Sequence, residues 1–217
     1  MTDPLRDRLR QAYENGAEAR DRLVLPQWKI SERAGFLSQL QANGLTRLLE
    51  AGAGTGRDGR FFVDAGCVVT CIDLSPAMVK LCRSKGLDAL VMDVANMSFD
   101  DRSLDAVYSF NSLLHLPKTE LPDVLREIRR ILRPEGLFYF GTYGGFDHEG
   151  IYEGDNHDPS RFFSFYDDEH LKFVVGKSFN VLDFRSIDLN ERDSRFRFQS
   201  LLLRKPISGN LDLDVKG

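Results

Sequence analysis

The 217-residue sequence predicts one doubly wound α/β domain whose mostly parallel, seven-stranded sheet ends in an antiparallel hairpin. Strand-like and helix-like segments alternate four times within about 95 residues, the pattern of parallel strands joined by crossover helices. Two strand-like runs, 181–189 and 195–203, then flank a short polar segment, 190–194, as in a hairpin. A glycine-rich turn after the first strand is typical of a nucleotide-binding α/β unit.

That glycine turn lies in the run L-L-E-A-G-A-G-T-G-R-D-G and can be read in two frames. The frame G-x-G-x-G uses Gly52, Gly54 and Gly56, and it leaves Glu50 at the end of the strand. The dinucleotide frame G-x-G-x-x-G uses Gly54, Gly56 and Gly59, but it starts well beyond the apolar pair, whereas that fingerprint begins directly after its strand. The first frame is therefore favoured, and Gly59 has no role in it.

Two helices are expected before the first strand. Residues 5–20 are charged with sparse apolar positions, Pro26 interrupts, and residues 30–40 show helical spacing up to Asn43 and Gly44. Together residues 1–44 are predicted to form a helical cap. A lid and a packing layer are both compatible with this pattern.

The segments after the glycine turn give the alternation. A helix over 60–65 leads to the apolar run 67–72, which is typical of a buried parallel strand. Ser75 is a good N-cap with Pro76 at the first helical position, so a helix is expected up to Lys85.

The second half of the sheet is predicted from similar runs. Further strands are expected at 89–92, 104–110 and 137–142. The helix over 119–132 carries one apolar stripe. Residues 143–166 have no clear period and are expected to form a loop insertion, followed by a short helix over 167–175.

Composition excludes several classes of function. The net charge of -4, without a Lys or Arg run, argues against a nucleic-acid partner. Cys67, Cys71 and Cys82 lack metal-site spacing and are expected to be buried, reduced thiols. No run reaches the roughly 20 apolar residues of a membrane span, and the first residues lack a signal-peptide core. We therefore expect a cytoplasmic protein, as a monomer or homodimer, with no membrane partner.

Five segments in register carry a family resemblance: E-A-G-A-G-T-G, C-I-D-L-S-P-A-M, V-M-D-V-A, L-D-A-V-Y-S-F-N-S-L-L-H and R-R-I-L-R-P-E-G-L-F. With these and the terminal hairpin, residues 45–205 resemble the class I S-adenosylmethionine-dependent methyltransferases, which have a Rossmann-like fold. The likeness is greatest to small bacterial methyltransferases whose substrates are often unassigned. One mild departure is Ala53, where the family often carries Cys or Ser. Residues 206–217 would form a tail outside this domain.

The resemblance implies S-adenosylmethionine as cofactor and S-adenosylhomocysteine as product. Glu50 would lie near the methionine ammonium group, and Asp73 would accept both ribose hydroxyls, a task suited to two carboxylate oxygens. Asp93 would accept from the adenine amino group. The full set of implied cofactor residues is Glu50, Gly52, Ala53, Gly54, Gly56, Asp73, Leu74, Met78, Asp93, Val94 and Asn111.

The residues expected to bind the methyl acceptor lie in segments with a less regular sequence pattern. Methyl transfer mainly needs positioning, and a base only when the acceptor must lose a proton. His115, after the fourth strand, is the candidate catalytic base; the alternative is that it shapes the loop. Tyr13, Tyr143 and Arg161 are the candidate substrate-binding residues, with Arg161 either anchoring an anion or forming a salt bridge.

The acidic and histidine residues of the insertion raise the question of a metal. They are Asp147, His148, Glu149, Asp155, His157 and Asp158. Acidic loops are usually solvated, so no metal site is predicted.

Together these features predict a methyltransferase that acts on an oxygen or nitrogen atom of a small molecule. A tRNA or protein methyltransferase is one alternative, with the acidic composition against tRNA. A non-catalytic S-adenosylmethionine-binding module is another, and a nicotinamide oxidoreductase is disfavoured by the glycine frame and the hairpin.

Overall fold

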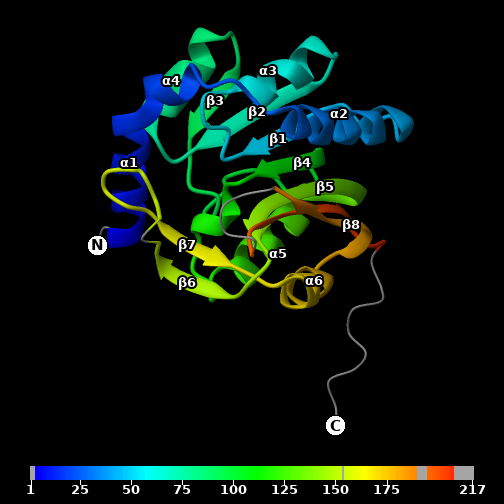
Figure 1. The fold of residues 1–217 in the computed structure, drawn as a ribbon. Coiled ribbons are helices and arrows are strands. Elements are labelled where there is room, and N and C mark those ends of the chain that lie inside the picture. The colour runs from blue at the N-terminus through cyan, green and yellow to red at the C-terminus, as the bar shows by residue number, and fades with distance from the viewer. Residues whose placement is uncertain (1–2, 153, 190–194, 208–217) are drawn as a thin grey trace.

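The computed structural model describes residues 3–152, 154–189 and 195–207, which form a seven-stranded sheet between layers of helices (Figure 1). The strand order is β3-β2-β1-β4-β5-β9-β8. The strands are β1 (Arg47–Ala51), β2 (Val68–Asp73), β3 (Asp88–Val91), β4 (Leu104–Phe110), β5 (Leu132–Gly144), β8 (Asn180–Asp188) and β9 (Arg197–Arg204). The helices are α1 (Pro4–Asp21), α2 (Gln27–Ala42), α3 (Arg57–Asp64), α4 (Pro76–Ser84), α5 (Leu121–Ile131) and α6 (Asp168–Gly176).

The predicted topology is confirmed. Strands β1 to β5 pair in parallel, and β9 pairs antiparallel with both β5 and β8. The expected connection of the terminal hairpin, 190–194, lies outside the described residues, as does most of the expected tail. Ser75 caps α4 by accepting from the Met78 N–H at 3.4 Å, with Pro76 at the first helical position as predicted.

Alternating side chains of the strands build two apolar layers. Leu48 and Tyr108 face the layer of α2, α3 and α4, which contributes Phe36 and Phe62. Leu49 faces the layer of α5 and α6 on the other side of the sheet. Figure 1 shows α2 and α3 above the sheet and α5 and α6 below it. Since both faces are covered, the strands read as continuous apolar runs in the sequence.

The region expected to be an irregular loop instead contains a second, two-stranded sheet. Strand β6 (His148–Ile151) pairs antiparallel with β7 (Phe162–Phe165). Phe163 and Phe165 of β7 pack with Leu114 in a small aromatic cluster. This pairing was missed because β6 is short and its partner is distant, so burial of the phenylalanines rather than a local pattern decides the structure.

Helix α2 is fixed to the sheet by a buried carboxylate. Glu32 is 4% exposed and accepts hydrogen bonds from Tyr139 Oη at 2.9 Å and Ser200 Oγ at 2.6 Å. Arg185 donates to both of its oxygens at 2.9 Å. These partners lie on β5, β9 and β8, so one side chain ties α2 to the antiparallel end of the sheet and sets where its first turn lies.

We predict that Glu32→Ala lowers the free energy of unfolding by about 2–3 kcal/mol, because Tyr139 and Arg185 lose a buried, charged acceptor. Denaturant unfolding measures the change. The control is Gln39→Ala on an exposed position of the same helix, with an expected effect within about 0.5 kcal/mol. Equal losses in the two variants would contradict the anchoring role.

Candidate active site

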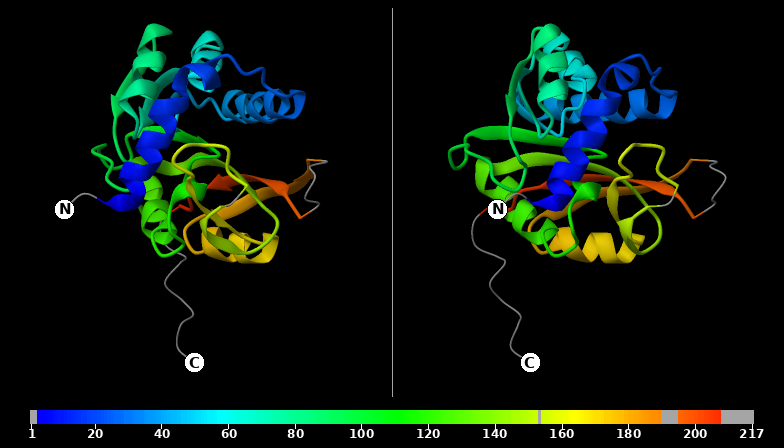
Figure 2. Two further views of the ribbon diagram at one scale, coloured as in Figure 1. Left: turned by 60° about the vertical axis from the view of Figure 1, so that its left-hand side comes forward. Right: turned by 90° about the vertical axis from the view of Figure 1, so that its left-hand side faces the viewer.

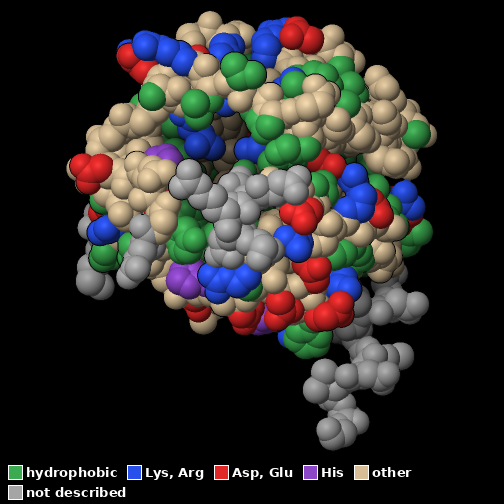
Figure 3. Space-filling model, in the orientation of Figure 1, with side chains coloured by type: hydrophobic (Ala, Val, Ile, Leu, Met, Phe, Trp, Pro, Cys, Tyr) green, Lys and Arg blue, Asp and Glu red, His purple; other side chains and the backbone are tan. Residues whose placement is uncertain are grey.

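Two neighbouring hollows flank the glycine turn at the carboxyl ends of the parallel strands. The first hollow holds about 870 Å³ between the turn, the ends of β2 and β3, and α1. The second hollow lies between the turn, the start of α3, and α2. Helix α1 crosses this edge of the sheet (Figure 2), and this face of the molecule is hollowed, with Lys and Arg side chains at the edge (Figure 3).

Most of the predicted site residues meet in these hollows. The first hollow is lined by Tyr13, Gly52, Gly54, Asp73, Leu74, Asp93, Val94, Asn111 and His115. The second is lined by Glu50 and Ala53, and it shares Gly52, Gly54 and Asn111 with the first. Open α/β sheets bind ligands at this edge, so the strand-end carboxylates lie where a ligand would contact them.

The glycine turn fits closely between β2 and the loop after β4. Gly52 has a φ of +78°, donates to the Ile72 carbonyl at 2.9 Å, and leaves no space for a Cβ, which would lie 1.9 Å from Ser112 Oγ. Gly54, with a φ of +55°, donates from its N–H to Asp73 Oδ2 at 2.8 Å, and the space beside its Cα is open. The turn therefore has no side chain at the point where a ligand can approach its backbone.

Gly56 and Gly59 serve packing instead. A Cβ on Gly56 would lie 2.7 Å from Leu87 Cδ1 and 2.9 Å from Cys82 Sγ. A Cβ on Gly59 would lie 2.5 Å from Glu50 Oε2, so this glycine lets α3 approach the end of β1. This accounts for the glycine that had no role in the G-x-G-x-G frame.

Asp73 and Asp93 each accept a hydrogen bond on both oxygens, but they differ in the groups that they bind. Asp73 accepts from the Gly54 and Ser75 N–H groups at 2.8 and 2.9 Å, and burial raises its pKa to about 6. Asp93 accepts from the Ala95 N–H at 2.9 Å, and its other oxygen accepts from Arg6 of α1. Asp93 is thus already paired with Arg6, a contact that was not predicted from the sequence.

Glu50 and Asn111 offer acceptors where the hollows meet. Glu50 is buried, accepts from Cys71 Sγ at 3.3 Å, and has a pKa raised well above its usual range by burial and then by the charge of Asp58. Asn111 has a left-handed φ of +54° and donates its N–H to the Gly141 carbonyl at 2.8 Å. Its side-chain oxygen is buried without a hydrogen-bond partner among the described residues. An unpaired buried acceptor at a cavity fits a donor on a ligand.

His115 lies in a directional chain of hydrogen bonds. Its Nδ1 is 2.9 Å from the Phe162 carbonyl, which can only accept, so Nδ1 carries the proton. Nε2 then accepts from Tyr13 Oη at 2.8 Å, and Tyr13 accepts from Arg161 Nη1 at 2.8 Å. Burial and then the charge of Arg161 lower the pKa of His115 to about 3, so the imidazole is neutral at pH 7.

Comparison with known proteins agrees with this geometry. Residues 49–140 match the family model described as a methyltransferase domain. This stretch is therefore similar to a methyltransferase domain, and the comparisons support a class I S-adenosylmethionine-dependent methyltransferase. A similar solved structure is the Burkholderia thailandensis 1,6-didemethyltoxoflavin-N1-methyltransferase, with a TM-score of 0.71, 19% identity, and coverage of 95% of this chain and 92% of that one. This likeness shows the methyltransferase fold.

Relatives by sequence include O- and N-methyltransferases. The malonyl-[acyl-carrier protein] O-methyltransferase of Geobacter sulfurreducens is 32% identical over 148 residues, or 64% of this chain and 54% of that protein. The glycine/sarcosine/dimethylglycine N-methyltransferase of Actinopolyspora halophila is 34% identical over 105 residues, or 44% of this chain and 18% of that protein. The chain spans about half the length of the malonyl relatives that it matches.

Four predicted site residues lie outside both hollows. Met78 is fully buried in α4, and Gly56 is the N-cap residue directly before α3. Tyr143 packs edge-on against Phe198, with ring centroids 5.9 Å apart. Arg161 is not an open anchor, because Asp155 accepts from its Nη2 at 2.8 Å and from its Nε at 3.0 Å. The salt-bridge alternative for Arg161 is the one that the structure contains.

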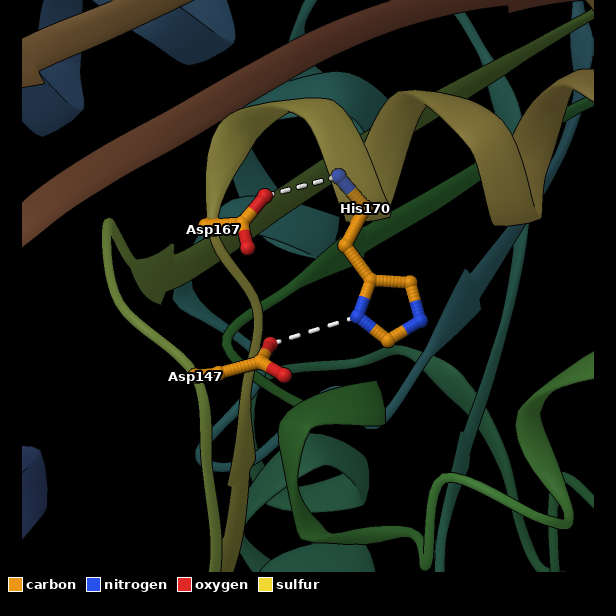
Figure 4. Close-up of side chains that lie close together, drawn as sticks. All are labelled: Asp147, Asp167 and His170. Atoms are coloured by element: carbon orange, nitrogen blue, oxygen red, sulfur yellow. Dashed lines mark hydrogen bonds and ion pairs between the residues drawn. The ribbon is translucent and has the colours of Figure 1, made fainter.

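The acidic residues of the insertion are separated in the fold. Asp155 and His157 lie beside Arg161, whereas Asp147 lies with Asp167 and His170 (Figure 4). Within the described ranges, this last trio brings ligand-type atoms within 4.8 Å of one another. Lys118 Nζ is 3.1 Å from Asp147 Oδ1 and balances its charge.

Sequence reasoning missed two cations of the N-terminal helices α1 and α2. Arg20 lines both hollows and Lys29 lines the second. Charged residues on an amphipathic helix are normally expected on its solvent-exposed face. No local pattern in the sequence distinguishes a charged residue that faces a cavity. None of the described helices is long and apolar enough to cross a membrane.

We predict opposite effects of alanine at two helical glycines. Gly59→Ala lowers the free energy of unfolding by about 1–3 kcal/mol, because the new Cβ must displace Glu50. Gly35→Ala, where nothing lies within 4 Å of the new Cβ, raises it by about 0.5–1 kcal/mol. Denaturant unfolding measures both. A stabilising effect at Gly59 would show that the contact with Glu50 does not constrain α3.

Proposed function

We propose that this chain transfers a methyl group from S-adenosylmethionine to an oxygen or nitrogen atom of a small molecule. The observation that carries the proposal is the open backbone at Gly54, bonded to Asp73 at the junction of the two hollows. The two oxygens of Asp73 suit a ribose diol, with Leu74 and Val94 beside the adenine. Asn111 Oδ1, unpaired and buried, suits a donor such as the methionine ammonium group.

An oxygen acceptor is favoured over nitrogen. The relatives that match most of the domain include malonyl-[acyl-carrier protein] O-methyltransferases. A carboxylate oxygen carries no proton at neutral pH, so its methylation needs no base. With a pKa of about 3, His115 is a poor base at pH 7, which fits an acceptor of this kind.

The bound cofactor would supply a methyl group that is already activated by a positively charged sulfur. An acceptor atom held in line with that methyl group would bond to its carbon with a lone pair, while the carbon–sulfur bond would break and leave its electron pair on sulfur. The protein's contribution is then to hold both partners in line and to exclude water. Helix α1 covers the first hollow, and His115 holds the Tyr13 hydroxyl in one orientation.

The proposed organisation follows from these contacts. Residues 1–44 act as a cap over the methyltransferase domain, 45–205, and the 143–166 insertion with β6 and β7 lies on the acceptor side. The small-molecule acceptor is the proposed partner. A cytoplasmic location is supported by three cysteines that form no disulfide.

Titration calorimetry with S-adenosylhomocysteine, S-adenosylmethionine and NAD tests the cofactor. We expect both sulfur ligands to bind and NAD not to bind. Asp73→Ala should weaken the binding of S-adenosylhomocysteine by at least about 30-fold, because two charge-assisted hydrogen bonds are lost. Asp88→Ala, an exposed position on β3, is the control and should bind as the native chain does. Binding of NAD alone would overturn the proposal.

The pH dependence follows from the pKa of Asp73. Because ribose hydroxyls need an ionised acceptor and the pKa in the free protein is about 6, acidification protonates Asp73 and opposes binding. We expect the dissociation constant for S-adenosylhomocysteine to rise about tenfold between about pH 7 and about pH 5. Asp73→Asn should lose this part of the pH dependence. A slope that persists unchanged in Asp73→Asn would assign it to another group.

A further inference from the structure

Lys29, in the first turn of α2, presents its ammonium group to the second hollow between aromatic rings. Its Nζ lies 5.2 Å from the ring centroid of Trp28, 5.4 Å from that of Phe110 and 5.6 Å from that of Tyr143. Within 3–152, 154–189 and 195–207, no carboxylate forms an ion pair with this ammonium group, and no acceptor forms a hydrogen bond with it. The recess thus combines one unpaired cation with flat apolar walls.

The cations that line this recess form no ion pair with a carboxylate of the described residues. Arg20 and Arg57 line the same hollow. Of the two carboxylates on its wall, Asp58 is paired with Arg33 at 2.9 Å. The other, Glu50, has a pKa raised by burial, which favours its neutral form. An anion that enters the hollow therefore meets three cations, Arg20, Lys29 and Arg57, none of which forms an ion pair with a carboxylate of the described residues.

The pKa of Lys29 agrees with this reading. Burial, and then the charge of Arg20, lowers the pKa of Lys29 to about 8, so the ammonium group is still mostly charged at neutral pH. Its charge is costly in this surrounding, and a bound anion would relieve that cost.

Lys29 shares the second hollow with Glu50, Gly54 and Asn111 but, unlike Arg20, does not line the first hollow. Arg57 begins α3, beside the glycine turn, and Arg20 lines both hollows. Lys29 instead contacts Phe110 and Tyr143, at the carboxyl ends of β4 and β5. These strands follow the two that carry Glu50 and Asp73 in the sheet order, so Lys29 faces away from the adenosine end.

We propose that the methyl acceptor is an organic acid, held with a carboxylate on Lys29 and its apolar part against Phe110, the aromatic side chain that lines the second hollow beside Lys29. This inference rests on the proposed methyltransferase function and names the substrate class of that site. Trp28 and Phe110 are partly buried beside Phe198, which holds both rings, with centroid distances of 4.6 and 4.7 Å. The walls are therefore preformed before a ligand arrives.

Calorimetry on the chain saturated with S-adenosylhomocysteine tests the proposal. The probes are benzoate, phenylacetate and 3-phenylpropionate, each compared with its neutral primary amide. We expect at least one acid to bind at least about tenfold more tightly than its amide. Lys29→Met should remove this preference, and Lys29→Arg, which keeps the charge, should retain it.

A matched control is Lys177→Met. Lys177 Nζ also lies over an aromatic ring, 4.2 Å from the centroid of Phe173, but it follows α6 on the opposite face of the sheet. This variant should keep the full acid preference. Loss of the preference in Lys177→Met as well would show a general effect of removing a surface charge and would overturn the assignment to Lys29.

A second comparison separates the acceptor's carboxylate from the cofactor's own. 5′-Methylthioadenosine lacks the amino-acid carboxylate that S-adenosylhomocysteine carries. Lys29→Met should bind both nucleosides as the native chain does, which also shows that the variant folds. If Lys29→Met binds S-adenosylhomocysteine about tenfold or more weakly than the native chain but binds 5′-methylthioadenosine equally well, Lys29 binds the cofactor and the acceptor assignment is wrong.

The remaining outcomes are equally decisive. If S-adenosylhomocysteine binds but no acid exceeds its amide, or if the preference survives in Lys29→Met, the organic-acid proposal fails while the methyltransferase function stands. If S-adenosylhomocysteine does not bind to the native chain, the proposed function itself fails and this inference falls with it.

Discussion

The hydrogen bond from the Gly54 N–H to Asp73 fixes the turn on which the whole site depends. Together with the bonds from Gly52 and Ala53 to the Ile72 carbonyl, it ties the end of β1 to the end of β2. The turn can lie this close only because Gly52 has no Cβ to meet Ser112, and α3 can follow only because Gly59 has none to meet Glu50. Backbone geometry, rather than any reactive side chain, thus positions the two hollows.

The parts of the fold that depend on local chemistry could be predicted from the sequence. Ser75 with Pro76 marks the start of α4, and buried runs mark the parallel strands, since these signals need no knowledge of distant residues. The end of β2 at Asp73 was predicted in the same way, whereas the role of Asp73 toward the ribose came from the family resemblance. The pairing of β6 with β7 and the ion pair between Arg6 and Asp93 could not be predicted, because their partners are distant in the sequence and only burial brings them together.

Charge compensation explains why similar residues acquire different roles. In the sequence Arg161 was either an anchor for an anion or a salt-bridge partner, and Lys29 was one charged residue among many on a helix. In the fold Asp155 neutralises Arg161, which then holds the Tyr13 hydroxyl toward His115. Lys29 has rings instead of a carboxylate around it. Whether a cation is available to a ligand depends on its tertiary partners, which residue type and spacing do not reveal.

Helix α1 covers the first hollow without being packed like a core element. Among the residues that the structure describes in this helix, only Ala12 and Ala17 are buried, and its ends are held by Arg6 on Asp93 and by Asp21 on Lys85. Elements with few buried apolar contacts open at a lower free-energy cost than the core does. A cover held mainly by polar contacts suits a site that must admit a cofactor, exclude water during transfer, and release the product. The family resemblance implies that the adenine amino group would use the carboxylate that Arg6 already binds, and cofactor binding would then be coupled at Asp93 to the position of this cover.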